Sequence, residues 1–373
     1  MAFVAEIGRL VIKIMFHYRF DLKYTYHDFD PKTKKPYLLI GNHATQHDPL
    51  IVGMVIKRYP YPVANAFLYT SKIQKFLLTK VVQSISKRKG QSDAQTIRKI
   101  IRSIKDEKRP VMLFPEGNAT YYGEQSPVDY VSTSKLIKKL GVDVIFVNIR
   151  GGYLSHPRWG RYMKNGHFHS HFYKLFSKEE LTKLDVNTIG MKLENAMQFN
   201  DFKWNEIGQY SYPIKHRANG IEHYLYYCPI CKQTQTLKGK NEHILCSKCG
   251  IVGTFDEHSQ LKSPYESLVH WGNDQYNHID KIMKKPIITS GLIYDVDPVK
   301  QKRKKIGVCD VTLTKDLLTI HSQPPIEMPM KALRGEVITR KHKVSFDYEQ
   351  KTYNLLLKDP MLALHAIRYA KEN

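Results

Sequence analysis

Apolar runs and helix-like periodicity alternate along roughly the first 200 residues of the chain. The clearest helix should begin at Ser92, with Gln95 as its capping-box partner and four isoleucines between Ile97 and Ile104 on one face. A second predicted helix, Ser134–Leu140, ends at a glycine, which favours a C-cap. The apolar runs that predict strands are Tyr37–Gly41, Ala66–Tyr69, Val82–Ser86, Val111–Phe114, Val144–Asn148 and His167–Phe172. This alternation predicts an α/β domain with a largely parallel sheet flanked by helices.

The pattern changes after this domain. We interpret Asn200–Gly220 as a connector and expect a helix over Ser263–Met283. Strands are then expected at Leu292–Val296, Gly307–Leu313, Leu317–His321, Glu336–His342, Lys343–Tyr348 and Thr352–Leu357. A closing helix over Met361–Tyr369 makes this a small β-rich C-terminal domain that ends in a helix. Its topology alone resembles a pleckstrin-homology-like (PH) or GRAM-like roll.

Residues 2–20 predict an amphipathic helix. Glu6, Arg9, Lys13 and His17 fall on one helical face, and apolar residues cover the rest. The charges interrupt any signal-peptide core, and no run approaches the roughly 20 apolar residues of a membrane span. The helix could lie at a membrane interface, pack on its own domain, or do both. We therefore expect four segments: the amphipathic helix 1–20, the α/β domain 21–205, a cysteine module 221–262, and the β-rich domain 286–373.

The chain of 373 residues carries a formal net charge of +23. Its 42% hydrophobic content excludes a disordered chain. The positive charge predicts an anionic partner, which could be nucleic acid, an anionic membrane or a phosphorylated substrate. Charge alone does not choose among these partners.

Two short loops carry candidate chemistry. Asn42-His43-Ala44-Thr45-Gln46-His47-Asp48 closes the first predicted strand, and Phe114-Pro115-Glu116-Gly117 closes a later one. A hydroxyl that reacts as a nucleophile needs a base to take its proton, and a neutral imidazole serves near pH 7. A carboxylate on the other ring nitrogen would fix the tautomer and stabilise the imidazolium. His43 and Asp48 are five positions apart, so a turn or early helix can bring them together.

Together the two loops resemble those of the glycerolipid acyltransferase family, whose best-known members acylate 1-acylglycerol-3-phosphate. The resemblance covers roughly residues 20–200, and Thr45 stands where the family commonly has serine. It implies the glycerolipid acyltransferase fold, with His43 as general base and Asp48 as the residue that orients it. His47 lacks the glutamate of a His-Glu-x-x-His metal motif, so we expect it to line the cleft or be exposed.

The resemblance also implies acceptor-binding residues. Glu116 and Gly117 would help to hold the glycerol or phosphate of the acceptor. The other residues expected to contact substrate are Asn42, Thr45, Asn118, Lys87 and Arg88. In the family a Gly-x-x-Phe-Ile-x-Arg block lies where this chain reads Val82 to Arg88 without the glycine and phenylalanine. The family's usual Thr-Arg-Ser after the glycine is Asn118-Ala119-Thr120 here, so another cation, such as Arg98 or Arg150, could take the place of the missing arginine.

Four cysteines form two Cys-x-x-Cys pairs, which are typical of a zinc ribbon in a reducing compartment. The predicted ligands of one Zn²⁺ are Cys228, Cys231, Cys246 and Cys249. Four protein ligands leave no open position, so the zinc should be structural. The fifth cysteine, Cys309, stands alone and is expected to fill apolar space.

These observations favour a peripheral acyltransferase on the cytoplasmic face of a membrane, acting in phospholipid biosynthesis. The acceptor would be lysophosphatidate or a related lysoglycerolipid. The co-substrate would be an acyl carrier protein thioester, a coenzyme A thioester or an acyl phosphate. One alternative is a zinc-ribbon nucleic-acid-binding protein, although we do not expect nucleic acid as a partner. The other is a catalytically silent lipid-binding scaffold. The sequence leaves open the donor, the chain length, the headgroup, the role of the last two modules and the oligomeric state.

Overall fold

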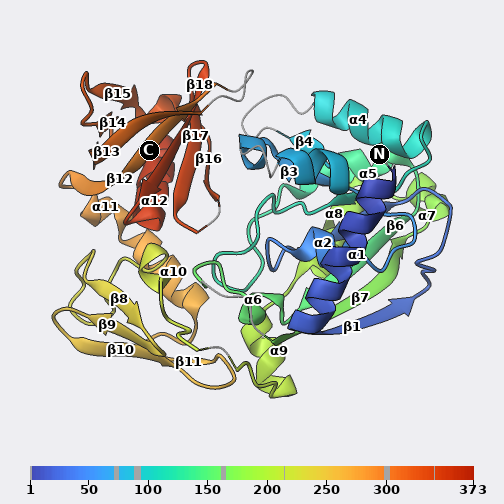
Figure 1. Ribbon diagram of the computed structural model, residues 1–373, viewed down its shortest axis with the longest axis horizontal. Coiled ribbons are helices and arrows are strands. Elements are labelled where there is room, and N and C mark those ends of the chain that lie inside the picture. Colours follow the sequence, from blue (N-terminus) through green and yellow to red (C-terminus); the bar gives the residue numbers. More distant parts are fainter. Residues whose placement is uncertain are drawn as a thin grey trace.

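The computed structural model describes residues 2–70, 75–87, 94–160, 165–213, 215–297, 303–339 and 341–373. An N-terminal α/β lobe lies beside a second lobe that contains the cysteine module and the C-terminal β domain (Figure 1). Among the described residues, none of the helices has both the length and the apolar composition that crossing a membrane requires.

The α/β lobe contains a seven-stranded sheet in the order β1-β7-β6-β2-β5-β3-β4. Every neighbouring pair is parallel except β6 and β7. The predicted, largely parallel sheet is therefore confirmed. Its strands, in chain order, are β1 Phe20–His27, β2 Leu38–Gly41, β3 Tyr61–Asn65, β4 Ile85–Lys87, β5 Val111–Leu113, β6 Val144–Arg150 and β7 Gly166–Phe176.

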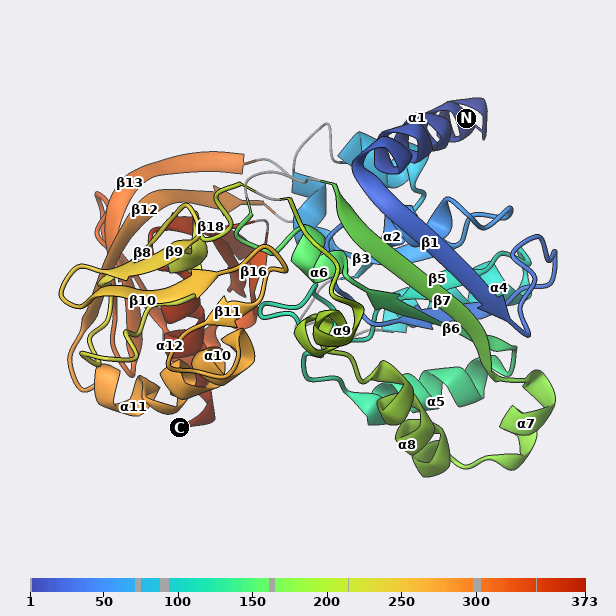
Figure 2. The same cartoon turned by 90° about the horizontal axis from the view of Figure 1, so that it is seen from below.

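The central strand β2 is apolar on both faces because each face is covered. Leu38 and Ile40 are fully buried in one hydrophobic cluster, and Leu39 is fully buried in another. Figure 2 shows α4, α5 and α8 on one side of the sheet and α1 and α2 on the other. These helices are α1 Ala2–Arg19, α2 Asp48–Gly53, α4 Ala94–Lys105, α5 Tyr130–Leu140 and α8 Val186–Met197. As expected, Gly141 ends α5 in the left-handed conformation.

Two strand predictions in this lobe need correction. Ala66–Tyr69 was expected to be a strand but lies in the 3-10 helix η1, Ala66–Thr70. The Asn65 side-chain oxygen accepts a hydrogen bond from the Phe67 backbone N–H at 2.9 Å, which starts this turn. The prediction for Val82–Ser86 is only partly right, because the π-helix η2, Leu77–Val81, precedes β4.

Strands β1 and β3 were not predicted. Alternating polar and apolar residues in β1 suit an edge strand, and Pro62 in β3 argued against a strand there. The helix expected from Ser92 is α4, which begins at Ala94. Ser92 itself lies outside the described residues.

The cysteine module is a four-stranded antiparallel sheet in the order β11-β10-β9-β8. Its strands are β8 Leu237–Lys240, β9 His243–Cys246, β10 Gly250–Phe255 and β11 Leu261–Lys262. The connector before it contains helix α9, Asp201–Gly208. The single helix expected after it divides at His278 into α10, Leu268–Asn277, and α11, Ile279–Ile282.

The C-terminal domain is a seven-stranded antiparallel sheet in the order β15-β14-β13-β12-β18-β17-β16. Its first strand, β12, pairs with both β13 and the last strand, β18. The chain then ends in α12, Pro360–Glu372. The strands are β12 Ile287–Val296, β13 Arg303–Leu313, β14 Leu317–Ile320, β15 Ile326–Pro329, β16 Arg334–Thr339, β17 Lys343–Tyr348 and β18 Lys351–Leu357. Only β15 was not predicted; two prolines precede it, and a third ends it.

The two lobes share one continuous hydrophobic core. The cluster includes Trp159 from the α/β lobe, Trp271 from α10 and Phe346 from β17. Buried Arg158 joins the lobes directly, because its guanidinium donates to the Ile338 carbonyl at 2.6 Å. The lobes are therefore held together by core packing as well as by the connector.

Candidate active site

His43 follows the buried end of β2, at the edge of the sheet where Phe114 follows β5. Its ring stacks on the Phe114 ring, with centroids 4.6 Å apart. The Nδ1 atom of His43 lies 2.8 Å from Oδ2 of Asp48, and the His43 side chain is 15% exposed. A small part of the imidazole therefore remains accessible while its orientation is fixed.

Asp48 lies in the first turn of α2 and is fully buried. Its carboxylate also accepts hydrogen bonds from the Thr45 backbone N–H, at 3.0 and 3.1 Å, and from the Thr45 hydroxyl, at 2.8 Å. A carboxylate held in this way accepts a hydrogen bond from Nδ1–H of His43. The proton then stays on Nδ1, and the ring lone pair lies on Nε2. The described residues offer no hydrogen-bond partner to Nε2, so this nitrogen can act as a base toward a bound hydroxyl.

Glu116 ties the two loops together. Its carboxylate accepts the His43 backbone N–H at 2.7 Å and the Ser126 backbone N–H at 2.9 Å. Thr120 adds a backbone bond to the His43 carbonyl at 2.8 Å. Burial raises the pKa of Glu116 to about 8, although the two N–H donors favour its charged form. We expected Glu116 to hold the acceptor; the structure places its oxygens on backbone donors, and contact with an acceptor stays a prediction.

Asn42 and Thr45 also hold the loop from inside. The Asn42 side chain, 1% exposed, donates to the Ile149 carbonyl at 2.9 Å and accepts the Ile149 N–H at 2.7 Å. Thr45 is 3% exposed and bonds Asp48. Both were expected to contact substrate, but the structure shows them fastening the His43 loop to β6 and to Asp48.

A cavity of about 210 Å³ opens beside the loop of Glu116 and Gly117. Its lining includes Phe114, on which the His43 ring stacks, but not His43 itself. Lys87, Glu116 and Gly117 line it together with apolar side chains from β3, α4 and α5. Gly117 is exposed and has φ 70°, a conformation that favours glycine. Lys87 thus lies in the same cavity as the second loop, and its contact with the acceptor stays a prediction. Asn118 is partly exposed on that loop, and Arg88 lies outside the described residues.

The two suggested substitutes for the missing arginine lie elsewhere. Arg98 is exposed on α4. Arg150 donates to the Gln198 carbonyl at 3.1 Å and lines a different depression. Neither lines the cavity beside Gly117.

Two further histidines, His47 and His156, lie next to each other at the border of the site. Their contact was not predicted. The His47 ring lies 5.2 Å from the His156 ring and 5.6 Å from the Phe16 ring of α1. Burial lowers the pKa of His47 and lowers that of His156 to about 3. Both rings are therefore neutral near pH 7. No local sequence signal joins His156 to His47, which precedes it by more than 100 residues.

The four cysteines of the Cys-x-x-Cys pairs converge in the second lobe, with all four sulfurs within 4.8 Å of one another. Cys228 and Cys249 are 4.0 Å apart, and Cys231 and Cys246 are 3.7 Å apart. Neighbouring sulfurs of a tetrahedral site lie about 3.8 Å apart when the metal–sulfur bonds are about 2.3 Å. The geometry and the donor set therefore fit one metal ion with four thiolate ligands.

A second group of possible metal ligands lies on the outer strands. Asp21 of β1 pairs in register with His167 of β7, and its carboxylate lies 2.9 Å from the His167 ring. His169 is the third member of this group. The Lys23 ammonium lies 3.9 Å from the same Asp21 oxygen and competes with any cation there. This group therefore carries no assignment.

The fold and site define an α/β enzyme domain built around a His–Asp pair at a strand end. Residues 23–149 match the family model described as Acyltransferase. This part of the chain is therefore similar to the acyltransferase family.

Two named proteins are similar to it. A Saccharomyces cerevisiae (strain ATCC 204508 / S288c) protein named 1-acyl-sn-glycerol-3-phosphate acyltransferase is 25% identical over 169 residues. The alignment covers 44% of this chain and 55% of that protein, so the chain spans about half the length of this relative. The crystal structure of the 1-acyl-sn-glycerophosphate acyltransferase PlsC from Thermotoga maritima matches with a TM-score of 0.39 and 14% identity. That match covers 53% of this chain and 82% of PlsC.

Proposed function

We propose that this protein transfers a fatty acyl group from an activated carrier to a hydroxyl of lysophosphatidate or a related lysoglycerolipid. The observation that carries the proposal is the His43–Asp48 pair, with Nδ1 engaged and Nε2 available, next to a cavity that Lys87 lines. The carrier would be a thioester of acyl carrier protein or coenzyme A, or an acyl phosphate. The name of the Saccharomyces cerevisiae relative supports the acceptor class.

The transfer needs one proton movement in each direction. Nε2 of His43 takes the proton of the acceptor hydroxyl as its oxygen attacks the acyl carbonyl. Asp48 stabilises the imidazolium that forms, because its buried charge lies on the other ring nitrogen. The tetrahedral intermediate then collapses, the carbon–sulfur or carbon–oxygen bond to the carrier breaks, and the imidazolium returns its proton to the leaving group. No acyl-enzyme is required.

The cavity offers both charged and apolar contacts to an acceptor. Lys87 brings a positive charge to the same space as the Gly117 backbone, and the carboxylates of Glu116 and Asp129 also line it. The positive φ of Gly117 and the absence of a side chain let its surroundings come close to a phosphate or glycerol oxygen. Val63, Ile100 and Leu136 line the remainder and suit an apolar part of a substrate. Arg88 and Asn118 remain proposed contributors.

Helix α1 supports a peripheral position on an anionic membrane. It packs inward through Phe16, which is 1% exposed, and through the Arg9 guanidinium, which lies 4.2 Å above the Tyr59 ring. Its outward apolar face is exposed in the described chain, with Leu10 57% and Ile14 62% exposed. Burial of such a face at a lipid interface, together with the net charge of +23, favours peripheral attachment. Both readings of this segment, packed helix and interfacial helix, are compatible with this arrangement.

The two C-terminal modules are proposed to be accessory. Zn²⁺ held by the four cysteines would stabilise the ribbon, and since all four positions are protein thiolates, it would take no part in acyl transfer. The β-rich domain resembles a PH-like or GRAM-like roll only by analogy of topology. Its proposed role is lipid sensing or partner binding.

Lipid mass spectrometry in a host that accumulates lysophosphatidate tests the proposal. Expression of the wild type should deplete lysophosphatidate and increase its diacyl product. His43→Ala should abolish the change, whereas His27→Ala, at an exposed position on β1, should preserve it. An unchanged lipid profile with the wild type, or an equal effect of His43→Ala and wild type, would reject the proposal. The first outcome would also favour a silent scaffold.

A further inference from the structure

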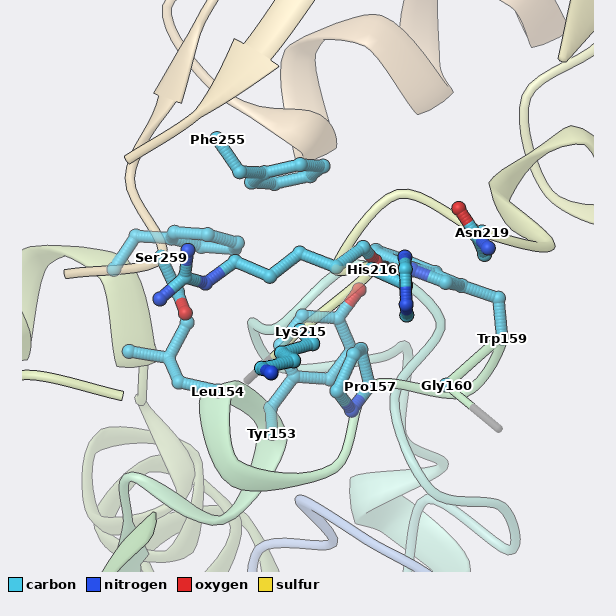
Figure 3. Close-up of a pocket in the computed structure, with 12 residues that line it drawn as sticks. Tyr153, Leu154, Pro157, Trp159, Gly160, Lys215, His216, Asn219, Phe255 and Ser259 are labelled. Carbon is cyan, nitrogen blue, oxygen red and sulfur yellow. Dashed lines mark hydrogen bonds between the residues drawn. The ribbon is translucent and has the colours of Figure 1, made fainter. Parts of the chain in front are cut away.

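A second cavity, of about 240 Å³, lies between the α/β lobe and the cysteine module (Figure 3). Its walls come from the loop after β6, from α9, from the connector and from the end of β10. The acyl-transfer mechanism above does not use this space.

One part of the wall is aromatic. Tyr153, Trp159, Phe202 and Phe255 line the cavity and contact one another, with ring centroids 5.9 Å apart for Tyr153–Trp159 and 6.2 Å for Trp159–Phe255. Figure 3 shows Phe255 on one side of the space, opposite Lys215 and Pro157. Aromatic walls of this kind favour a planar or apolar group by stacking and burial.

The other part of the wall carries two cations, Lys215 and Arg217. His216 lines it as well, and none of the described lining residues carries a carboxylate. Lys215 and His216 are exposed at its rim. Arg217 is held in place because its guanidinium donates to the Glu257 carbonyl at 3.1 Å. The carboxylates of Glu242, Asp256 and Glu257 act on Arg217, so the exposed Lys215 is the cation that favours an anionic ligand group, such as a phosphate.

Ser259 supplies an independent sign of a ligand. Its side chain lines the cavity and is only 6% exposed, yet its hydroxyl has no hydrogen-bond partner. Its backbone has φ 60°, and Asp256 holds the turn by accepting the His258 and Gln260 N–H groups, both at 2.9 Å. A buried hydroxyl without a partner costs stability, so the fold keeps a polar group here that a ligand can satisfy.

We propose that this cavity binds a phosphorylated nucleoside. The base lies against the aromatic wall, the phosphate lies at Lys215 and His216, and the Ser259 hydroxyl donates a hydrogen bond to the ligand. Asn219 also lines the cavity; its amide oxygen accepts the Asn241 N–H at 2.7 Å, and its NH₂ group can donate to a base. The ligand is either a free nucleotide or the nucleotide portion of a coenzyme A thioester, which share this chemistry.

The position of the cavity links it to the His43 loop. Tyr153 and Leu154 belong to helix α6, Gly152–Ser155. A Cβ on Gly152 would lie 3.1 Å from the Ala44 Cβ and 3.3 Å from the Thr45 Cγ2, so this turn packs directly on the loop that holds Asp48. A ligand against Tyr153 therefore touches a helix that packs on the loop holding Asp48.

Isothermal titration of the full chain tests the proposal with six probes: AMP, ADP, ATP, adenosine 3′,5′-bisphosphate, coenzyme A and inorganic phosphate. At least one nucleotide should saturate one site and bind at least tenfold more tightly than inorganic phosphate. Preference for coenzyme A and the bisphosphate identifies the thioester source, and preference for AMP, ADP or ATP identifies a free nucleotide.

Two substitutions locate the site. Lys215→Met should weaken binding about tenfold, and Ser259→Ala should weaken it about fivefold through loss of one hydrogen bond. Ser259→Ala should not lower the thermal midpoint of the free protein, because it removes an unpaired buried hydroxyl. The matched control Lys238→Met, at an exposed lysine of β8, should bind like the wild type.

The proposal is overturned if no nucleotide saturates the protein, if inorganic phosphate binds as tightly as every nucleotide, or if both substitutions leave binding unchanged. The measurement requires no turnover, and His43→Ala should bind the same ligand with wild-type affinity. Failure of the nucleotide site is therefore distinguishable from failure of the proposed acyl transfer.

Discussion

Asp48→Asn isolates the electrostatic role of the carboxylate while keeping its shape. Thr45 gives the carboxylate two donors, one N–H and one hydroxyl, so the asparagine oxygen should stay on Thr45. The amide NH₂ then faces Nδ1 of His43, which must become an acceptor. The ring proton moves to Nε2, and the lone pair needed to take the substrate proton is lost.

The magnitude follows from the geometry. Nδ1 and Oδ2 are 2.8 Å apart, and Asp48 is fully buried. Two unit charges whose centres are about 4 Å apart interact by about 4 kcal/mol at an effective dielectric constant of about 20. Loss of that stabilisation from the imidazolium in the transition state lowers kcat about 10³-fold. We expect a much smaller change in KM, because the carboxylate does not line the cavity beside Gly117.

The assay is steady-state release of the carrier thiol from an acyl thioester, with lysophosphatidate as acceptor. Thr45→Ser keeps the hydroxyl donor to Asp48 and should retain kcat within about threefold. Circular dichroism and the thermal midpoint establish that Asp48→Asn is folded. A folded Asp48→Asn protein with kcat within threefold of wild type would refute the role of this carboxylate in stabilising the imidazolium.

Three further predictions concern the rest of the molecule. Cys249→Ser, or removal of metal by a chelator, should lower the thermal midpoint, and elemental analysis should find one zinc per chain in the wild type. Burial lowers the pKa of His365 to about 3. Because this folded-state pKa lies below its unfolded value of about 6.5, its contribution to stability is full above that pH and falls as the pH decreases, by about 2 kcal/mol at pH 5. His365→Gln should remove this part of the slope in urea unfolding. Leu10→Asp with Ile14→Asp should weaken sedimentation with anionic vesicles more than tenfold, because two exposed apolar side chains no longer enter the interface.

Each of these predictions has a matched control. Cys309→Ser should leave the zinc content unchanged, since Cys309 lies outside the four-cysteine cluster. His27→Gln, at an exposed histidine, should keep the wild-type pH slope. Val131→Asp with Met191→Asp changes exposed apolar residues on α5 and α8, across the sheet from α1, and should leave vesicle binding unchanged. A zinc-free but equally stable wild type, an unaltered slope in His365→Gln, or undiminished vesicle binding would each contradict the corresponding prediction.

The His43–Asp48 pair and the cysteine cluster could be predicted from the sequence because their members are close in the chain. His43 and Asp48 are five residues apart, and the turn into α2 brings them together. The four cysteines likewise come in two short pairs, one in the turn before β8 and one in the turn between β9 and β10. In both cases the spacing itself limits the structures that the segment can adopt.

Long-range contacts were beyond the reach of sequence reasoning. Asn42 looked like a substrate ligand, but its amide is satisfied by Ile149, 107 residues away. Glu116 bonds the His43 backbone across 73 residues. The bond from Arg158 to Ile338, which joins the lobes across 180 residues, had no local signal. Two strands were also not predicted. The polar residues that alternate in β1 and the proline in β3, Pro62, weakened the strand pattern.

Acyl transfer by the purified protein tests the central claim most directly. Wild type and His43→Ala are incubated with an acyl thioester and lysophosphatidate, and the diacyl product is measured by mass spectrometry. The account predicts product from the wild type and none above the uncatalysed background from His43→Ala. Equal product from the two proteins, with both folded, would contradict it.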